Sequence, residues 1–482
     1  MLRKSLLALA FFAAGGAAAQ TGNPAGDPLG NPSGVDFLLR PSQDADDLLI
    51  DDPWDWESEP EPALIDVPPG PPLAGPVEGE PIGPPLAGPV SIDPGPPVRL
   101  PRPEDAEPFA APGLNLGSFV IRPAIEIGVA ATDNAAGTED KVGAVGLVLA
   151  PELTIRSEDD RHEIVADIRA ASVFYDREEF DSTTADARVA ARYELTSRTA
   201  LAAEVGYSRF EEGFTDPDTP GAAAERPVVN ELDAALGIEQ RFGRLGVGVT
   251  GFVDRSMHED VPLAGGGSAS REELDNTEYG VRVRTGYEVT ASLTPFTEVA
   301  VGQRDFDQRV DDSGFERSSL WGELRGGIVV ERGDKLAGEI SLGYRHEDLD
   351  DGALEDLDVF LANASLLWSP RRFTELRVDL TTETIPTSVP EVSATILYSG
   401  TFTLARRLSP RIRVEAGGGI DYEYPIGDSW EDLTFRGFAG ASYAFSRNAS
   451  LEARYLYEQT ESNLPDSDTN EHAVTLRIRF QR

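Results

Sequence analysis

Histidines are the side chains of this sequence best suited to acid–base chemistry, and there are four: His162, His258, His346 and His472. His258 and His346 are each followed directly by two acidic residues, which could orient an imidazole as the general base of a hydrolase. Acidic residues are frequent in every loop-like stretch of the chain, so such neighbours are also expected without catalysis. We therefore predict that the protein is not an enzyme and keep a hydrolase with a site at the rim as the third choice.

Charged residues that alternate with apolar ones suggest a different use, the sorting of solutes. Glu375, Arg377 and Asp379, for example, are separated by leucine and valine. Rings of such side chains around an aqueous channel select solutes by charge, and the same side chains can form cross-strand ion pairs that stiffen the wall. Both interpretations stay open. The predicted pore-lining residues are Arg282, Arg284, Arg345, Arg377, Arg413, Arg454, Arg477, Arg479, Glu339, Glu375, Asp379, Glu415 and Glu452.

Strands must position these charges, because successive side chains of a strand point to opposite faces. Near the end of the sequence, Leu476, Ile478 and Phe480 fall on one face, and Arg477 and Arg479 fall on the other. The alternation restarts about eighteen times between residues 120 and 480. No stretch reaches the ~20 apolar residues of a transmembrane helix. The pattern predicts an all-β fold, a transmembrane antiparallel up-and-down β-barrel of about 18 strands (16–18), with the charged face inside.

Connections between the predicted strands are alternately short and long. Short turns are expected near residues 157–160, 196–199, 243–244, 290–293, 332–335, 369–372, 409–410 and 447–449. The longer connections are rich in Asp, Glu, Gly and Pro. In outer-membrane barrels the short turns face the periplasm and the long loops face the outside.

The N-terminus indicates export. Arg3 and Lys4 precede a short apolar core, and Ala17–Ala19 followed by Gln20 offers a small-residue cleavage site, so residues 1–19 are predicted to be a signal peptide. The sequence contains no cysteine, which excludes disulfides, thiolate catalysis and a lipid anchor on an N-terminal cysteine.

Residues 20–117 are predicted to be a disordered, acidic, Pro-rich tether in the periplasm. Between residues 41 and 98 there are thirteen acids, sixteen prolines and no Lys or Arg. Fully extended, this stretch would reach on the order of 180 Å. Within it, Leu48, Leu49, Ile50, Trp54 and Trp56 lie among five acids. They are either a docking motif for a periplasmic protein or peptidoglycan, or incidental residues of a solvated linker.

Residues 118–482 form the predicted barrel domain, and its first third resembles the opening of the β-barrel porin-2 type outer-membrane proteins of Gram-negative bacteria. The resemblance rests on Arg122-Pro123, Glu126–Gly128, Thr132–Asn134, Leu149–Leu153, Arg161-His162 and Phe174-Tyr175. It implies the fold and the cell outer membrane. Some members are associated with exopolysaccharide export. The resemblance carries no catalytic motif, and it does not explain the tether.

We therefore predict a porin-like passive conduit for hydrophilic solutes that contacts outer-membrane lipid. The alternative is a component of envelope polysaccharide export. No cofactor, metal or phosphate-binding motif is found, and a net charge of -42 argues against nucleic acid as a partner. Whether copies of the chain form a homo-oligomer is left open.

Overall fold

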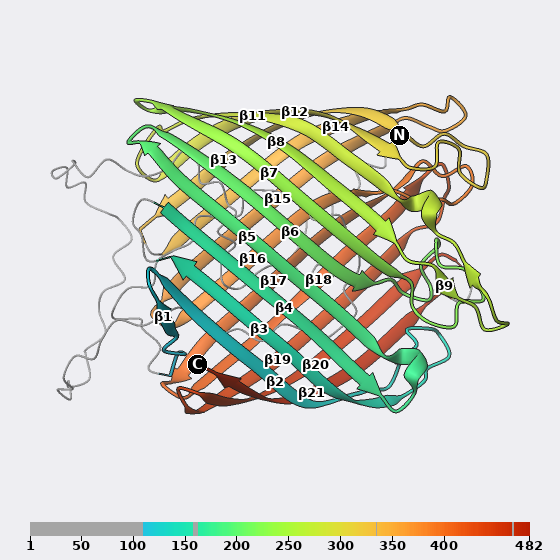
Figure 1. Ribbon diagram of the computed structural model, residues 1–482, viewed down its shortest axis with the longest axis horizontal. Helices are drawn as coiled ribbons and strands as arrows, with labels where there is room; N and C mark the ends of the chain where they lie inside the picture. Colours follow the sequence, from blue (N-terminus) through green and yellow to red (C-terminus); the bar gives the residue numbers. More distant parts are fainter. Residues whose placement is uncertain (1–108, 158–161, 334, 465–466) are drawn as a thin grey trace.

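The computed structural model describes residues 109–157, 162–333, 335–464 and 467–482 (Figure 1). The segments with period-two alternation form paired strands in it. The predicted signal peptide (1–19), most of the predicted tether, and its docking motif at Leu48–Ile50, Trp54 and Trp56 lie outside the described residues. No helix of the described residues is long and apolar enough to cross a bilayer.

Eighteen long strands of 12 to 16 residues make up the wall. They are β2 (Phe119–Thr132), β3 (Ala144–Ser157), β4 (His162–Tyr175), β5 (Ser182–Thr196), β6 (Thr199–Glu211), β7 (Val228–Phe242), β8 (Leu245–His258), β11 (Asn276–Tyr287), β12 (Leu293–Phe306), β13 (Ser319–Arg332), β14 (Leu336–Leu349), β15 (Leu357–Arg371), β16 (Thr374–Ile385), β17 (Ala394–Ser409), β18 (Ile412–Ile426), β19 (Asp432–Ser446), β20 (Ala449–Ser462) and β21 (Thr469–Gln481). The short elements are β1 (Leu114–Leu116), β9 (Val261–Pro262), β10 (Ser268–Ala269) and the 3-10 helices η2 (Glu178–Phe180) and η3 (Glu272–Leu274).

Each long strand pairs antiparallel with the next one along the chain, and the ring closes where β2 meets β21, with Ile127 opposite Ile478. The β9–β10 hairpin lies within the connection between β8 and β11. A closed ring leaves no unpaired sheet edge, which is the condition for a sheet inside a membrane. The prediction of an antiparallel barrel of about 18 strands is confirmed.

The connections are also arranged as predicted. Turns such as that between Phe242 and Leu245 lie at one end of the barrel, together with the C-terminal residues, and the long loops lie at the other (Figure 1). The two 3-10 helices and the β9–β10 hairpin belong to the long-loop end, at the right of the view. We call this end the mouth.

The last residues of the predicted tether are structured. β21 ends opposite Ala124, so the first residues of β2 have a free edge, and β1 fills it with Leu114 opposite Ile121. An unpaired strand edge is unstable in a sheet until something covers it. Residues 114–116 thus belong to the sheet, although the tether was predicted to extend to residue 117.

The two faces of the wall have opposite character. Leu476 is 46% exposed on the outside, whereas its neighbour Arg477 is only 5% exposed on the inside. Exposed aromatic side chains gather at the short-turn end of the outer face: Tyr193, Phe242, Tyr287, Trp368, Tyr443, Phe445 and Phe480. Apolar residues outside and charged residues inside, with an aromatic girdle, are the arrangement of a transmembrane barrel.

The wall is doubled near the mouth, where β16, β17 and β18 bend inward. The β15–β16 ladder stops at the pair of Ala364 and Leu380. Beyond it, Ile396 and Tyr398, which continue the outward face of β17, pack against Val359 on the inner face of β15. Side chains replace the missing ladder bonds, since Tyr398 Oη donates to the Phe360 carbonyl at 2.8 Å. The inward bend narrows the lumen on this side.

Candidate functional site: the charged lumen

Ion pairs line the inner face, and one group joins the first and last strands. Glu126 on β2 accepts from Arg477 at 2.8 Å and from Arg479 at 2.7 Å, both on β21. Arg479 also contacts Glu152 on β3 at 2.6 Å. These three strands close the barrel, so the network ties the chain's two ends together. Buried pairs of this kind are strongly destabilised when one partner is removed.

A second group covers the wall from β11 to β14. Arg304 contacts Glu278 at 2.5 Å and Glu347 at 3.2 Å, and Arg345 contacts Glu347 at 2.8 Å. Arg282 contacts Glu298 at 3.2 Å. The arginines of this wall thus have acidic partners on their own strand, on the next strand or, for Arg304 and Glu347, two strands away.

The thirteen predicted pore-lining residues all fall on the inward face. Arg284 contacts Glu339, Arg454 contacts Glu415 at 3.1 Å, and Arg377 lies 4.0 Å from Asp379. Glu452 accepts from Ser450 at 3.3 Å, and Arg413 and Glu375 occupy inward positions of β18 and β16. The structure brings these residues to one face but distributes them around the ring. Of the two predicted roles of these residues, the structure shows the cross-strand ion pairs. Their part in permeation belongs to the proposed function below.

Loops cross the mouth. Ser388, between β16 and β17, donates to Asp218, between β6 and β7, through its backbone N–H at 2.8 Å and its hydroxyl at 2.7 Å. Eight of the eighteen strands separate these loops in one direction around the ring, so they reach each other from nearly opposite sides. Arg317 adds bonds to the carbonyls of Val392 and Val389 at 2.6 and 2.9 Å.

A cavity of about 200 Å³ lies below these loops, between the wall of β7–β14 and the inward-bent strands β16–β18. Trp321 lines it from β13 and lies against Gly302 on β12, where a Cβ atom would come within 2.5 Å of its ring. Only glycine at position 302 leaves room for the indole. Arg345 lies over the indole face, 4.1 Å from the ring centre, a cation–π contact.

Acidic groups gather around this cavity. Asp216 is in the β6–β7 loop, and burial together with the charges of Glu212, Asp218 and Glu423 raises the pKa of Asp216 well above its usual range. Glu423 comes from β18, on the other side of the lumen from β6 and β7. Carboxylates of two distant walls thus face the same space.

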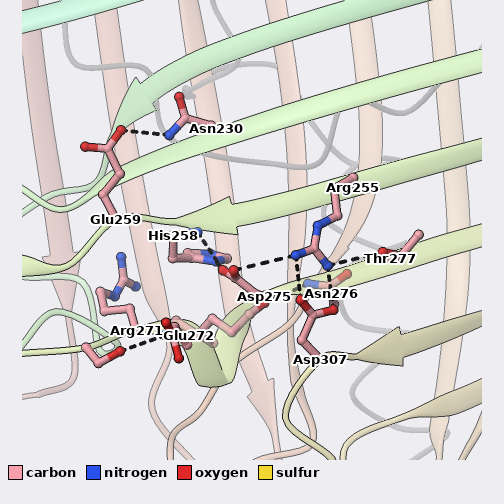
Figure 2. A network of polar contacts seen from close by, with 12 residues as sticks. Asn230, Arg255, His258, Glu259, Arg271, Glu272, Asp275, Asn276, Thr277 and Asp307 are labelled. Carbon is pink, nitrogen blue, oxygen red and sulfur yellow. Dashed lines mark hydrogen bonds and ion pairs between the residues drawn. The ribbon is translucent and has the colours of Figure 1, made fainter.

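Of the four histidines, His258 lines the cavity and the other three do not. His258 Nδ1 is 3.2 Å from Asp275, which also lies 3.7 Å from Arg255, and Arg255 contacts Asp307 at 2.6 Å (Figure 2). The hydrogen bond from Arg255 lowers the pKa of Asp307. This is a network of ion pairs at the mouth that joins β8 to two loops. The network fastens the end of β8 to the segments that carry Asp275 and Asp307.

The other three histidines are separated around the outer face. His346 Nδ1 is 2.9 Å from Asp358, Tyr455 Oη is 2.7 Å from His472 Nδ1, and His162 stacks on Tyr193 at 3.9 Å between ring centres. The acids that follow His258 and His346 in the sequence do not contact these imidazoles. Asp275 and Asp358, from later parts of the chain, contact them instead.

Comparison with known protein families gives one match, the family described as "Putative beta-barrel porin 2", over residues 107–482. The match covers the whole described barrel. The chain belongs to this family. As an outer-membrane porin-like barrel of the Gram-negative envelope, it has the location predicted from the alternation and the resemblance.

Comparison with solved structures gives matches of low sequence identity. The siderophore receptor PirA from Pseudomonas aeruginosa is 9% identical (75% of this chain, 80% of that chain, TM-score 0.37). OpdL from Pseudomonas aeruginosa is 11% identical (76% and 99%, TM-score 0.37), and OccAB3 from Acinetobacter baumannii is 9% identical (76% and 100%, TM-score 0.37). No curated protein matches the chain. The family assignment therefore rests on the family match alone.

Several residues of the cavity were missed by the sequence reasoning. They are Glu231, Asp233, Asp254, Glu383, Glu423 and Trp321. Glu231 and Asp233 alternate with apolar residues as clearly as the predicted pore-lining residues do, so the period-two pattern is enough to predict their inward positions. Trp321 and the approach of Glu383 and Glu423 depend on the inward bend of β16–β18, which has no signal in the local sequence.

Proposed function

We propose that this porin-like barrel is a passive conduit for small hydrophilic solutes. The observation that carries the proposal is the inversion of the two faces: a charged surface encloses the lumen, and an exposed apolar band with an aromatic girdle surrounds the wall. In this arrangement the outer band contacts lipid and the lumen holds water. A passive conduit needs no catalytic group, and none is part of the proposal.

The loops that cross the mouth favour small solutes over a polymer. A polysaccharide chain would have to pass the contact between Asp218 and Ser388, which joins two loops across the mouth, and a small solute needs less space to do so. We therefore rank the export of envelope polysaccharide second.

We also propose that residues 1–19 are removed on export and that the following acidic segment is a periplasmic tether. Its attachment supports this orientation, because Phe109 lies at the short-turn end. There Arg411 lies over its ring at 4.6 Å and Gln481 Nε2 donates to its carbonyl at 3.4 Å. Short turns face the periplasm in outer-membrane barrels.

Planar-bilayer recording of the purified full-length protein tests the conduit. We expect discrete steps of current with a small unit conductance in simple salt, because the crossing loops restrict the mouth. A reversal potential under a salt gradient should then show a preference for cations, as expected from the excess of acids around the cavity. Bilayers that take up correctly folded protein without any current steps would refute the proposal.

A further inference from the structure

The cavity below the crossing loops has an unbalanced charge. Ten acidic side chains line it, against five arginines. The surplus matters because like charges that share a confined space of low dielectric repel each other more strongly than they do in water. Such a site is stabilised by a positively charged ligand.

The arginines of the cavity already have partners. Arg304 and Arg345 contact Glu278 and Glu347, Arg325 contacts Glu323, and Arg282 contacts Glu298. These pairs neutralise the wall of β11–β14 internally. They leave little positive charge to balance acids elsewhere in the cavity.

Five other acids that line the cavity form no ion pair within the described residues: Glu231, Asp233, Asp254, Glu383 and Glu423. Asp233 and Asp254 are direct cross-strand partners on the same face, and Glu278 lies directly opposite Asp254 on the next strand. Side chains in such positions are about 5 Å apart at Cβ, and like charges there are destabilising. Arg188 acts on Asp233, and Arg282 and Arg304 act on Asp254, but these arginines are paired with Glu204, Glu298 and Glu278, respectively.

The opposite wall adds to this row of acids. Glu383 and Glu423 both lie opposite Leu397 of β17, one on each side, so roughly 10 Å separates their strands. Glu383 is close enough to Glu231 for its charge to act on that side chain across the lumen. The acids thus surround the cavity from two sides at spaced intervals.

Several buried polar groups in the cavity have no hydrogen-bond partner, among them Asp254 Oδ1. Trp321, 4% exposed, has a free indole N–H, and Asp233, 7% exposed, has a free Oδ2. Buried polar groups normally find a partner, and an orphan in a cavity indicates where a ligand or water completes the bonds. The free acceptors Asp233 Oδ2 and Asp254 Oδ1 suit an ammonium or guanidinium N–H, whereas the Trp321 N–H suits water or an acceptor elsewhere in the solute, because ammonium and guanidinium groups only donate.

We propose that the cavity binds a solute that carries two or more amino or guanidinium groups, held by the unpaired acids. The proposal rests on the conduit function and names its substrate class. In the bound state, one cationic group of the solute lies beside Asp233 and Asp254 on one wall. Another lies beside Glu383 and Glu423 on the opposite wall. The ligand enters by the mouth and leaves by diffusion through the lumen.

An organic polycation fits the spacing of the acids better than a metal ion does. Within the described part of the chain, no three Asp, Glu or His side chains converge closely enough to hold a metal ion. A metal needs several oxygens at 2.0–2.6 Å from one centre. Spaced carboxylates instead suit charges that are separated along a flexible chain.

The test uses full-length protein and spermidine as the probe, with Ca²⁺ and tetramethylammonium as comparison ions. Spermidine added on the mouth side should block the single-channel current at concentrations at least tenfold lower than either comparison ion. Tryptophan fluorescence of the detergent-solubilised protein gives a second readout that needs no current. We expect a saturable change with spermidine that is lost in Trp321→Phe.

Two variants test whether spermidine binds in the cavity, and a third is the matched control. Asp233→Asn with Asp254→Asn, and separately Glu383→Gln, should each raise the half-blocking concentration of spermidine about tenfold or more. Glu415→Gln removes a lumen acid that is paired with Arg454 and does not line the cavity, and it should leave the block unchanged. Retained heat-modifiable gel mobility shows that each variant is folded.

The outcomes separate the two proposals. Current without a spermidine block or fluorescence change overturns the polycation site and leaves the conduit standing. A saturable fluorescence response in a protein that carries no current overturns the conduit and keeps the site. If Ca²⁺ matches spermidine, or if Glu415→Gln weakens the block as much as the cavity variants do, the site is not selective for organic polycations and the inference is wrong.

Discussion

The network that closes the barrel can be tested by one isosteric change, Glu126→Gln. It removes the charge that Arg477 and Arg479 share while keeping the size of the side chain and an oxygen that accepts hydrogen bonds. All three side chains are 6% exposed, so solvent screens the interaction little. Removing one partner of a buried pair typically costs ~3–5 kcal/mol.

The expected cost lies at the lower end of that range, about 3 kcal/mol, because Arg479 keeps its contact with Glu152. For a chain of this size that corresponds to a fall of roughly 3–5 °C in melting temperature. The measurement is the temperature at which the folded band disappears in heat-modifiability gels, checked by the loss of β-sheet circular dichroism.

Glu316→Gln is the control. Glu316 pairs at 3.3 Å with Arg309, whose side chain is 84% exposed, and an exposed pair contributes at most about 1 kcal/mol. If Glu126→Gln has the same melting temperature as the parent and this control, the charge network does not stabilise the β2–β21 closure and the reasoning is refuted.

Three further predictions concern the outer face, the mouth and the acidic loop. Leu476→Arg places a charge in the exposed apolar band and should cost about 2–4 kcal/mol in unfolding titrations, whereas Leu476→Val should cost far less; equal costs would show that this face does not contact lipid. Asp218→Ala removes both bonds of the bridge across the mouth, whereas Ser388→Ala removes only the hydroxyl bond and keeps the backbone one, so Asp218→Ala should raise the unit conductance more than Ser388→Ala does. Adding Ser388→Ala to Asp218→Ala should change nothing further, and strictly additive effects would contradict a shared contact. The folded-state pKa of Asp216 is raised, so its favourable contribution to stability is fully present below the unfolded-state pKa and is lost as the pH rises through the folded-state pKa. Asp216→Asn should therefore have a higher melting temperature than the parent at neutral pH and the same melting temperature in acid. A difference in melting temperature that grows in acid would contradict this sign.

The alternation by itself was enough for the strand count, the orientation of each face and the positions of the turns. Arg477 and Leu476 illustrate why: neighbouring strand residues must point to opposite sides, and one of the two faces must avoid water. A pattern of this kind is local, so it survives small errors in the bounds of single strands.

The partners of the charges could not be obtained in the same way. Glu126 contacts residues more than 350 positions away in the chain, and His258 contacts Asp275 rather than the acids that follow it. Pairing depends on the register of each ladder and on which strand closes the ring. Neither is encoded in the period of a single segment.

The sequence therefore determined the kind of protein, an exported chain whose strands put apolar side chains outside and charged ones inside. Only the tertiary structure decided where the lumen narrows and which acids stay unpaired. The β15–β16 ladder ends early, β16–β18 bend inward, and Glu383 thereby comes to face Glu231. The physical reason is that face and period are properties of neighbouring residues, whereas a cavity is made by segments that meet only once the ring has closed.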